Sequence, residues 1–425
     1  MSESIFDALA WRGLVAQSTD AEALRRHFAA GPVTYYCGFD PSAPSLHIGN
    51  LVQILTLRRL QLAGNHPLAL VGGATGLIGD PKMTGERNLN DPDTVAAWVD
   101  RIRRQIEPLL DFEGAYAARM VDNLDWTSQL SAIDLLRGVG KHFRLSSMLA
   151  KETVARRLAS DQGISFTEFS YQVLQALDFR ELYRRHGCTL QTGGNDQWGN
   201  LLGGVELIRK AEGQTAHAFT TPLITKADGT KFGKTETGTV WLDPAMTTPY
   251  AFYQFWLNQD DRDAPEYLKV FTFRSPDEIA ELAAAARERP QERACQKALA
   301  WDVTVLTHGR AAAKGAADAA AALFGAGSLA DLDADSLASA VAGLPTAPVR
   351  RADGEISVVD ALAASGLEKS KGAARRTLAS GGVYLNNAKV ADPDAVLQPG
   401  DFLHGRFAVL RRGRKTLAVV ELARL

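Results

Sequence analysis

Two segments of the chain combine residue types that can hold a polyphosphate. The first covers residues 36–50, YCGFDPSAPSLHIGN, and places Ser42 and His47 in a loop before a predicted helix. Unpaired backbone N–H groups and the positive dipole of a helix N-terminus favour phosphate there. Gly49 lets a nucleotide lie close to the backbone because it has no side chain. A simple capped helix explains residues 47–50 better when this segment is considered alone.

The second segment, KADGTKFGKT at residues 226–235, concentrates positive charge in a loop rich in glycine. Lys231 and Lys234 lie three residues apart, so such a loop can close over phosphates and neutralise the charge on a departing pyrophosphate. A solvated surface hairpin is the ordinary explanation for this segment alone. The presence of both segments in one chain favours the phosphate interpretation.

Short apolar runs and helical patterns alternate through the first half of the chain. Residues 33–37, 67–73 and 189–194 are predicted strands, and residues 51–64 between the first two have helical spacing. This alternation indicates a parallel sheet with crossover helices, an α/β fold. Ligands of such sheets bind at the carboxyl ends of the strands, so the residues that follow each strand are the candidates for function.

The second half of the chain divides into further predicted parts. A Rossmann-like catalytic domain at 1–225 is followed by a mobile lysine loop and connection at 226–247 and an α-helical domain at 248–325. The Ala-, Gly- and Asp-rich stretch 326–350 is predicted to be a linker. Residues 351–425 form a small α+β domain with 12 Lys or Arg against 8 Asp or Glu, a net charge of +4. A basic module suggests RNA phosphates, although a solvated surface explains the charge equally well.

The composition excludes several classes of protein. The 425 residues carry 47 Lys or Arg and 49 Asp or Glu, a net charge of -2, so the chain as a whole is no general nucleic-acid or membrane binder. Cys37, Cys188 and Cys295 are widely spaced, which argues against a disulfide scaffold or a zinc cluster. No export signal or stretch of about 18 apolar residues is found, so we expect a cytoplasmic protein without a membrane partner.

Longer stretches make a family resemblance specific. The sequences YYCGFDPSAPSLHIGN, VGGATGLIGDP, TGGNDQWGN and ISFTEFSYQVLQALDF resemble the bacterial tyrosyl-tRNA synthetases, over essentially the full chain. Residues 47–50 match the family's His-Ile-Gly-His signature, and residues 231–235 match Lys-Met-Ser-Lys-Ser. The resemblance implies a class I catalytic domain, a helical anticodon-side domain and a C-terminal RNA-binding domain of a ribosomal-protein (S-four-like) type. It also implies a homodimer with L-tyrosine, ATP and tRNA(Tyr) as partners.

The resemblance assigns residues to a tyrosine pocket. Tyr36 and Asp178 would contact the substrate hydroxyl, Asp80, Tyr171 and Gln175 would receive the ammonium group, and Gln197 completes the substrate-binding set. Tyr171, Gln175 and Asp178 lie at i, i+4 and i+7, so they share one face of a helix. Without the resemblance, a core aromatic and a solvated helix residue are the ordinary explanations of Tyr171 and Asp178.

The resemblance also assigns residues to ATP and to catalysis. The ATP-binding set is Cys37, Gly38, Asp40, Ser42, His47, Gly49, Asn50, Gly194, Asp196 and Lys234. The catalytic set is His47, Asn50, Lys231, Lys234 and Thr235, acting with Mg²⁺ that arrives with ATP, and no tightly bound metal site is expected. Asn50 replaces the second histidine of the first signature, and Gly233 replaces the serine of the second. These departures put in doubt whether the two residues have the same roles as the family's histidine and serine.

The basic residues of the C-terminal domain are the candidates for RNA contact. They are Lys369, Lys371, Arg375, Arg376, Arg411 and Arg412. Two rivals to a tyrosine enzyme stay open at this point. One is a tryptophan-specific class I synthetase on the same scaffold, and the other is a catalytically inactive synthetase-like RNA-binding protein.

Overall fold

The computed structural model describes residues 4–82, 85, 89–161, 163–230, 232–235, 238–324, 327–350, 355–392, 394–413 and 416–423. The chain divides by its contacts into two compact units. The first contains residues 1–243 and 260–285, and the second contains residues 244–259 and 286–425. Among the described helices, none has the length and apolar character needed to cross a membrane.

A mixed six-stranded sheet forms the centre of the first unit. Its strands are β1 (Gln17–Ser18), β2 (Thr34–Phe39), β3 (His66–Val71), β4 (Arg119–Asp122), β5 (Leu190–Gly194) and β6 (His217–Thr221). They lie in the order β1-β6-β5-β2-β3-β4, and all neighbours are parallel except the β1–β6 pair. The predicted parallel sheet is therefore confirmed, with strands close to the three predicted ranges.

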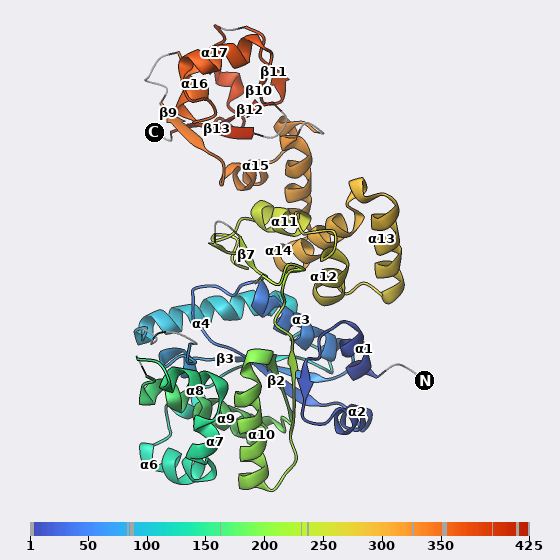
Figure 1. Cartoon of the computed structure of the whole chain (residues 1–425), viewed down its shortest axis with the longest axis vertical. Helices are drawn as coiled ribbons and strands as arrows, with labels where there is room; N and C mark the ends of the chain where they lie inside the picture. Colours follow the sequence, from blue (N-terminus) through green and yellow to red (C-terminus); the bar gives the residue numbers. More distant parts are fainter. Residues whose placement is uncertain are drawn as a thin grey trace. The chain divides into compact units, whose positions relative to one another are not determined.

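Helices cover both faces of this sheet (Figure 1). The long helices are α1 (Ile5–Trp11), α2 (Ala21–Ala29), α3 (Ile48–Leu62), α4 (Pro92–Ile106), α9 (Phe166–His186) and α10 (Trp198–Glu212). α3 and α4 lie on one face, and α9 and α10 pack on the other, where Tyr36, Leu68 and Phe179 share one hydrophobic cluster. Central parallel strands are buried on both faces, which explains their continuous apolar character.

The ends of α9 are set by local chemistry. Ser165 accepts a hydrogen bond from the backbone N–H of Glu168 at the N-terminus, and Gly187 ends the helix with φ of 63°. The Glu168 side chain is buried and pairs with Arg157 at 2.8 Å. The capped ends and the buried ion pair hold α9 in one position against the sheet, and this position determines where its polar side chains lie.

Shorter elements complete the first unit. They are α5 (Leu124–Thr127), α6 (Ala132–Asp134), α7 (Leu145–Leu149), α8 (Glu152–Leu158), the β7 (Lys234–Thr235) and β8 (Gly238–Thr239) hairpin and α12 (Ala264–Phe271). The unit ends within α13 (Pro276–Glu288), whose last residues belong to the second unit.

The second unit consists of helices and a five-stranded sheet. Its helices are α11 (Pro249–Leu257), α14 (Ala294–Leu323), α15 (Ala334–Val341), α16 (Val358–Ala364) and α17 (Lys371–Ala379). The sheet order is β11 (Ala388–Lys389), β10 (Val383–Leu385), β12 (Phe407–Arg412), β13 (Thr416–Leu422) and β9 (Thr346–Val349). Alternate residues of β12 face opposite sides: Phe407 and Val409 pack with α14 and α15, whereas Ala408 and Leu410 pack with α16 and α17.

The structure differs from the predicted linker at 326–350. This stretch contains α15, and its strand β9 pairs in parallel with β13, with Ala347 opposite Val420. Leu337 and Val341 are buried in the same cluster as β12 and β13. The bias toward small residues that suggested a connector instead allows close packing against the sheet. The two compact units also differ from the predicted domains. Residues 260–285 were predicted to lie in the α-helical domain 248–325, but they belong to the first unit.

Two histidines face each other near the amino ends of β5 and β6. The rings of His27 and His217 lie 4.9 Å apart, and His27 Nε2 lies 2.8 Å from Thr189 Oγ1. Burial lowers the pKa of His27, and burial and then the neighbouring His27 lower the pKa of His217, although Asp20 acts in the opposite direction. The unfolded chain therefore binds protons at these sites more readily than the folded chain does.

We predict that this pair makes the first unit less stable in mild acid. Because both pKa values lie below the ordinary value of about 6.5, stability contributed by the pair falls as the pH drops below about 6.5. The substitution His27→Gln should flatten this dependence in urea unfolding followed between pH 5.5 and 8. An equally steep dependence in the variant would contradict the prediction.

Candidate active site

The carboxyl edge of the sheet brings together the ends of β2 and β5. The chain runs from β2 to β3 and β4 in one direction and then returns to the other side of β2 as β5. Ligands of open α/β sheets bind at such a reversal. Asp40 follows β2 directly, and Asp196 lies two residues beyond the end of β5. The two groups of residues predicted to bind a nucleotide are thus brought to one edge from distant parts of the chain.

Tyr36 and Asp178 form a buried polar pair on the α9 face of the sheet. Their exposed fractions are 1% and 2%. The Tyr36 hydroxyl has no hydrogen-bond partner among the described residues. Burial raises the pKa of Asp178 to about 7, and burial followed by the nearby Asp178 charge raises the pKa of Tyr36. A buried acid beside an unpaired buried hydroxyl is costly unless a polar ligand group completes the set.

Two neutral donors hold the Asp178 carboxyl group. Asn123 Nδ2 donates to Oδ2 at 3.0 Å, and Trp126 Nε1 donates to Oδ1 at 2.8 Å. In the part of the chain that the structure describes, no lysine or arginine pairs with Asp178. Neither donor was predicted from the sequence. Asn123 directly follows β4, a position at the ligand edge that could have indicated it, whereas Trp126 carries no such signal.

A chain of hydrogen bonds connects this pair to the nucleotide side of the site. Thr75 Oγ1 accepts from Asn123 Nδ2 at 2.9 Å and donates to Asp40 Oδ1 at 2.7 Å. The Tyr171 hydroxyl donates to Asp40 Oδ2 at 2.6 Å. Tyr171, predicted to receive an ammonium group, therefore contacts a residue predicted to bind ATP. Thr75 was not predicted as a site residue, although it lies within the quoted stretch VGGATGLIGDP.

Asp80 lies among amide groups at the same edge. Gln197 Nε2 donates to its Oδ2 at 2.9 Å and Asn200 Nδ2 to its Oδ1 at 3.3 Å. Burial raises the pKa of Asp80 to about 6, with the Asp40 and Asp196 charges adding to the effect. The Gln175 Oε1 atom is buried and has no partner among the described residues. These acceptors suit a ligand cation, whose charge would favour the ionised carboxylate.

The residues after β2 lead into the N-terminus of α3. His47 is the N-cap residue: its Nδ1 accepts from Gly49 N at 3.0 Å, and its own N–H donates to Asn50 Oδ1 at 3.1 Å. The Asn50 oxygen is thus used in capping, which leaves its NH₂ group as the donor for a ligand. A Cβ atom on Gly49 would lie 2.8 Å from the His47 ring, so a side chain there would displace the capping imidazole. Burial raises the pKa of Cys37 to about 12, which excludes a thiolate nucleophile.

The lysine segment lies against the start of α3. Ile48 N donates to Val240 O at 3.2 Å, and His47 forms a bridge with Trp241. Gly233 has φ of 88°, and a Cβ atom there would lie 3.1 Å from Ile48. Lys231 lies outside the described residues, and Lys234 and Thr235 are described only by their backbone in β7. The backbone nevertheless places the two signature segments side by side.

α12 anchors the base of this lysine segment. The Phe232 ring lies 4.6 Å from the Tyr267 ring and 5.4 Å from the Phe271 ring. The Tyr267 hydroxyl donates to Thr225 O at 3.1 Å, and Asp263 Oδ1 accepts from Ala227 N at 2.8 Å. Both ends of the segment are therefore tied to one helix.

The predicted RNA-binding residues gather on two elements of the second unit. Lys371, Arg375 and Arg376 lie on α17 with Lys369 just before it, and Arg411 and Arg412 end β12. Lys371 pairs with Asp360 at 2.7 Å and Arg412 with Glu368 at 3.4 Å. The Arg411 guanidinium lies over the Tyr384 ring at 4.0 Å. The exposed side chains of Lys369, Arg375 and Arg376 are the ones most accessible to a partner.

The fold and the edge described above are those of a class I aminoacyl-tRNA synthetase, and the chain belongs to the family described as "tRNA synthetases class I (W and Y)", which matches residues 29–325. A second match, to a "Tyrosine--tRNA ligase SYY-like C-terminal domain", covers residues 336–420. This second match begins within the stretch predicted to be a linker.

Individual relatives agree with the family assignment. The chain is 63% identical over 419 residues to a tyrosine--tRNA ligase of Streptomyces avermitilis, covering 98% of this chain and 99% of the relative. It is 60% identical over 425 residues to one of Acidothermus cellulolyticus, covering 99% of each. A solved C-terminally truncated mitochondrial tyrosyl-tRNA synthetase of Coccidioides posadasii matches with a TM-score of 0.67 and 32% identity, over 74% of this chain and 91% of that chain.

We predict that Trp126 sets the ionisation of Asp178. The substitution Trp126→Phe keeps an aromatic ring but removes the N–H donor, so it should raise the pKa of Asp178 above its value of about 7. Carbon-13 NMR of labelled aspartate carboxyl groups measures this directly, with Asp178→Asn to assign the signal. A pKa unchanged in Trp126→Phe would contradict the prediction.

Proposed function

We propose that the protein is a tyrosine--tRNA ligase. It activates L-tyrosine with ATP to form tyrosyl-adenylate and pyrophosphate, and it then transfers tyrosine to the 3′ end of tRNA(Tyr). The single observation that carries this proposal is the buried Tyr36–Asp178 pair, because it offers an acceptor and a hydroxyl for a phenol oxygen. Family membership and the C-terminal domain of the tyrosine type support the same conclusion.

The pocket explains a preference for tyrosine over its closest competitors. Phenylalanine would leave the Tyr36 hydroxyl and the Asp178 carboxyl without their partner in a dry site, and each unpaired buried polar group costs roughly 1–3 kcal/mol. Tryptophan has one N–H donor and no phenol oxygen, so it would satisfy the pair less well. This argument favours tyrosine over the tryptophan-specific alternative.

The acceptors on the other side of the pocket suit the substrate ammonium group. Asp80, with Gln197 hydrogen-bonded to it, would accept one N–H, and the unpartnered Gln175 oxygen would accept another. The Tyr171 hydroxyl, already oriented by Asp40, would accept a third. The ammonium charge would lower the Asp80 pKa from about 6, so the carboxylate is ionised when substrate is bound.

Activation requires positioning rather than a general base. A free α-carboxyl group has a pKa of about 3.5, so it is already ionised when it attacks the α-phosphorus of ATP. His47 and Asn50 at the N-terminus of α3, with Lys231, Lys234 and Thr235 of the lysine segment, would stabilise the departing pyrophosphate. Mg²⁺ would arrive on the ATP phosphates and neutralise part of their charge.

The remaining predicted residues would surround the nucleoside. Asp196 can accept from ribose hydroxyl groups, and the backbone at Gly38, Gly49 and Gly194 permits close approach. At Gly194 a Cβ atom would lie 2.6 Å from Asp196 Oδ1, so the glycine also leaves room for that carboxylate. Cys37, Asp40 and Ser42 complete the proposed ATP-binding set.

Several exposed apolar side chains in the first unit are available for the proposed homodimer. Phe166 at the start of α9 has an exposed fraction of 79%, and Leu145 on α7 has 67%. Ile133 and Leu136 add exposed apolar side chains nearby in the sequence. A second copy of the chain is the proposed partner that would bury these side chains. The three cysteines are buried and unpaired, which fits the proposed cytoplasmic location.

Exchange of labelled pyrophosphate into ATP tests the proposed function without tRNA. We expect exchange with tyrosine and exchange weaker by about a hundredfold or more with phenylalanine and tryptophan, since neither completes the buried pair. Preferred exchange with tryptophan would move the chain to the other amino acid of its family. No exchange with folded protein and Mg²⁺ would favour the inactive RNA-binding alternative.

We predict that restoring the family's serine at position 233 impairs activation. Gly233 adopts φ of 88°, which strains any residue with a side chain by about 1–2 kcal/mol, and the added Cβ would press on Ile48. Gly233→Ser should therefore slow adenylate formation by about tenfold while changing the tyrosine KM little. Gly229→Ser is the matched control, since Gly229 has φ of 79° but open space around it. An equal or faster rate in Gly233→Ser would contradict the prediction.

We predict that the exposed face of α17 acts on tRNA and not on activation. The double substitution Arg375→Gln and Arg376→Gln should raise the KM for tRNA and make its salt dependence shallower, because two phosphate contacts are lost. Pyrophosphate exchange should be unchanged. Lys371→Gln is the control with a smaller expected effect, since Asp360 already pairs with Lys371. A parallel loss of exchange would show that these arginines support the fold instead.

A further inference from the structure

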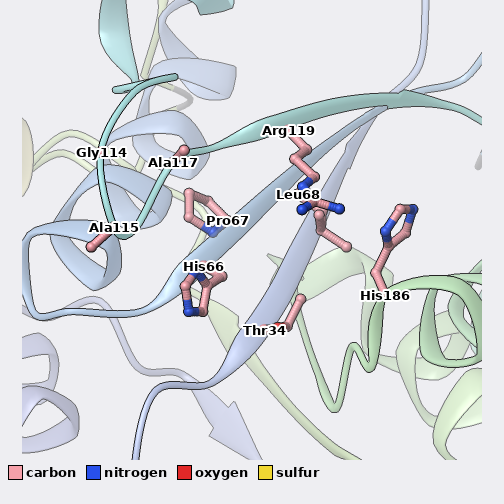
Figure 2. Close-up of a pocket in the computed structure, with 9 residues that line it drawn as sticks. All are labelled: Thr34, His66, Pro67, Leu68, Gly114, Ala115, Ala117, Arg119 and His186. Carbon is pink, nitrogen blue, oxygen red and sulfur yellow. The ribbon is translucent and has the colours of Figure 1, made fainter.

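A cavity lies at the amino edge of the first unit's sheet, opposite the carboxyl edge described above. Its volume is about 330 Å³, and it is lined by the first residues of β2, β3 and β4, by the loop at 114–117 and by His186 at the end of α9 (Figure 2). That volume falls at the small end of the range of about 300–1,000 Å³ for small-molecule sites. The cavity lies wholly within the first unit.

Each polar side chain that lines this cavity can donate a hydrogen bond. Arg119, His186, His66 and Thr34 contribute side chains, and no aspartate or glutamate is among the lining residues. Figure 2 shows the Arg119 guanidinium and the His186 ring on the same side of the cavity, flanking Leu68. A site with cationic and neutral donors but no carboxylate is suited to an anion.

Two of these donors lack partners within the protein. Arg119 is exposed and has no ion pair among the described residues, so its guanidinium is open to a ligand, and the buried His186 Nδ1 atom has no hydrogen-bond partner in the described ranges. His186 and Arg119 are close enough for the Arg119 charge to lower the His186 pKa, after the larger effect of burial. An anion in the cavity would accept a hydrogen bond from the charged Arg119 guanidinium and, when the proton is on Nδ1, from the neutral His186 ring.

The other contributions to the local charge do not reverse this conclusion. The C-terminal end of α9 carries a partial negative charge of about half a unit, which opposes an anion. The full charge of Arg119 exceeds that dipole contribution. The remaining wall is formed by Pro67, Leu68 and small residues, so an organic group can pack beside the charged end.

We propose that this cavity binds the oxyanion of a small phosphomonoester or carboxylate. Arg119 and His186 contact the oxyanion, and the organic part of the ligand lies against Pro67 and Leu68. Leu68 of the lining lies opposite Tyr36 in the β2–β3 ladder, and the rest of the lining lies toward the amino ends of the strands, away from the nucleotide edge that follows β2. The cavity therefore lies next to the proposed tyrosine pocket but shares none of the residues assigned to it.

Calorimetric titration of the full chain with glycerol 3-phosphate tests the proposal, with glycerate as the carboxylate probe and glycerol as the neutral control. Titrations are run with and without saturating tyrosine and a non-hydrolysable ATP analogue, which separates this site from the catalytic edge. We expect saturable 1:1 binding of at least one anionic probe that persists when both substrates are present. Which anion binds more tightly identifies the ligand class.

Charge-removing variants locate the binding. Arg119→Gln and His186→Gln should each weaken binding by about tenfold or more, because each removes a donor to a charged group. Arg184→Gln is the matched control: it removes a charge from the same turn as His186, but Arg184 pairs with Glu212 and does not line the cavity. It should change the affinity by less than about threefold, which is the effect of a screened surface charge.

Two results would overturn the proposal. One is the absence of saturable binding by either anion up to about 10 mM, an affinity weaker than about 3 kcal/mol. The other is an equal loss of affinity in Arg119→Gln and Arg184→Gln, which would indicate general attraction to a basic surface. Binding is measured without catalysis, so failure of the proposed ligase activity would leave this test unaffected.

Discussion

The buried carboxyl group of Asp178 is the constraint on which the proposed site depends. A carboxylate taken out of water without a cation is strongly disfavoured, and in this chain two neutral donors and no lysine or arginine of the described residues hold it. Burial raises the Asp178 pKa and the hydrogen bonds from Asn123 and Trp126 lower it, and the resulting pKa is about 7. The fold therefore keeps a costly buried group, and in the proposed function a ligand hydroxyl group adds to the two hydrogen bonds that the protein supplies.

The sheet topology explains how a single edge can hold both substrates. The reversal between β2 and β5 brings Asp40 and Asp196 together from distant parts of the chain. Asn123 and Thr75 then extend hydrogen bonds from Asp178 to Asp40, so the proposed amino-acid and nucleotide sides share one network. Such networks lose more than one contact when one member is removed, because the remaining groups are left unpaired. The lysine segment, tied to α12, completes the edge from the other side.

The amino-acid sequence predicted the parts of the fold that local patterns determine. The strands β2, β3 and β5 and the helix α3 follow from apolar runs and helical spacing, and the face shared by Tyr171, Gln175 and Asp178 follows from helical periodicity. The donors Asn123 and Trp126 were missed, because contacts between a loop and a helix far along the chain have no local signature. The stretch 326–350 was wrongly predicted as a linker, since its small residues resemble a flexible connector until β9 is paired with β13. From the sequence, Gly233 was only a departure from the serine of the signature, and its positive φ becomes visible only with the backbone.

The pH dependence of discrimination between tyrosine and phenylalanine tests the role of Asp178 most directly. The measured quantity is the ratio of kcat/KM for tyrosine to kcat/KM for phenylalanine in pyrophosphate exchange. Ionisation of a group such as Asp80, which acts on both substrates, affects both values equally and leaves the ratio unchanged. An ionised Asp178 would accept a stronger hydrogen bond from the phenol hydroxyl than the protonated acid would, and its pKa is about 7, so the ratio should rise as the pH increases from 6 to 8.5. In Asp178→Asn the ratio should be low at every pH. A ratio in the unsubstituted protein that stays constant across this range would contradict the account.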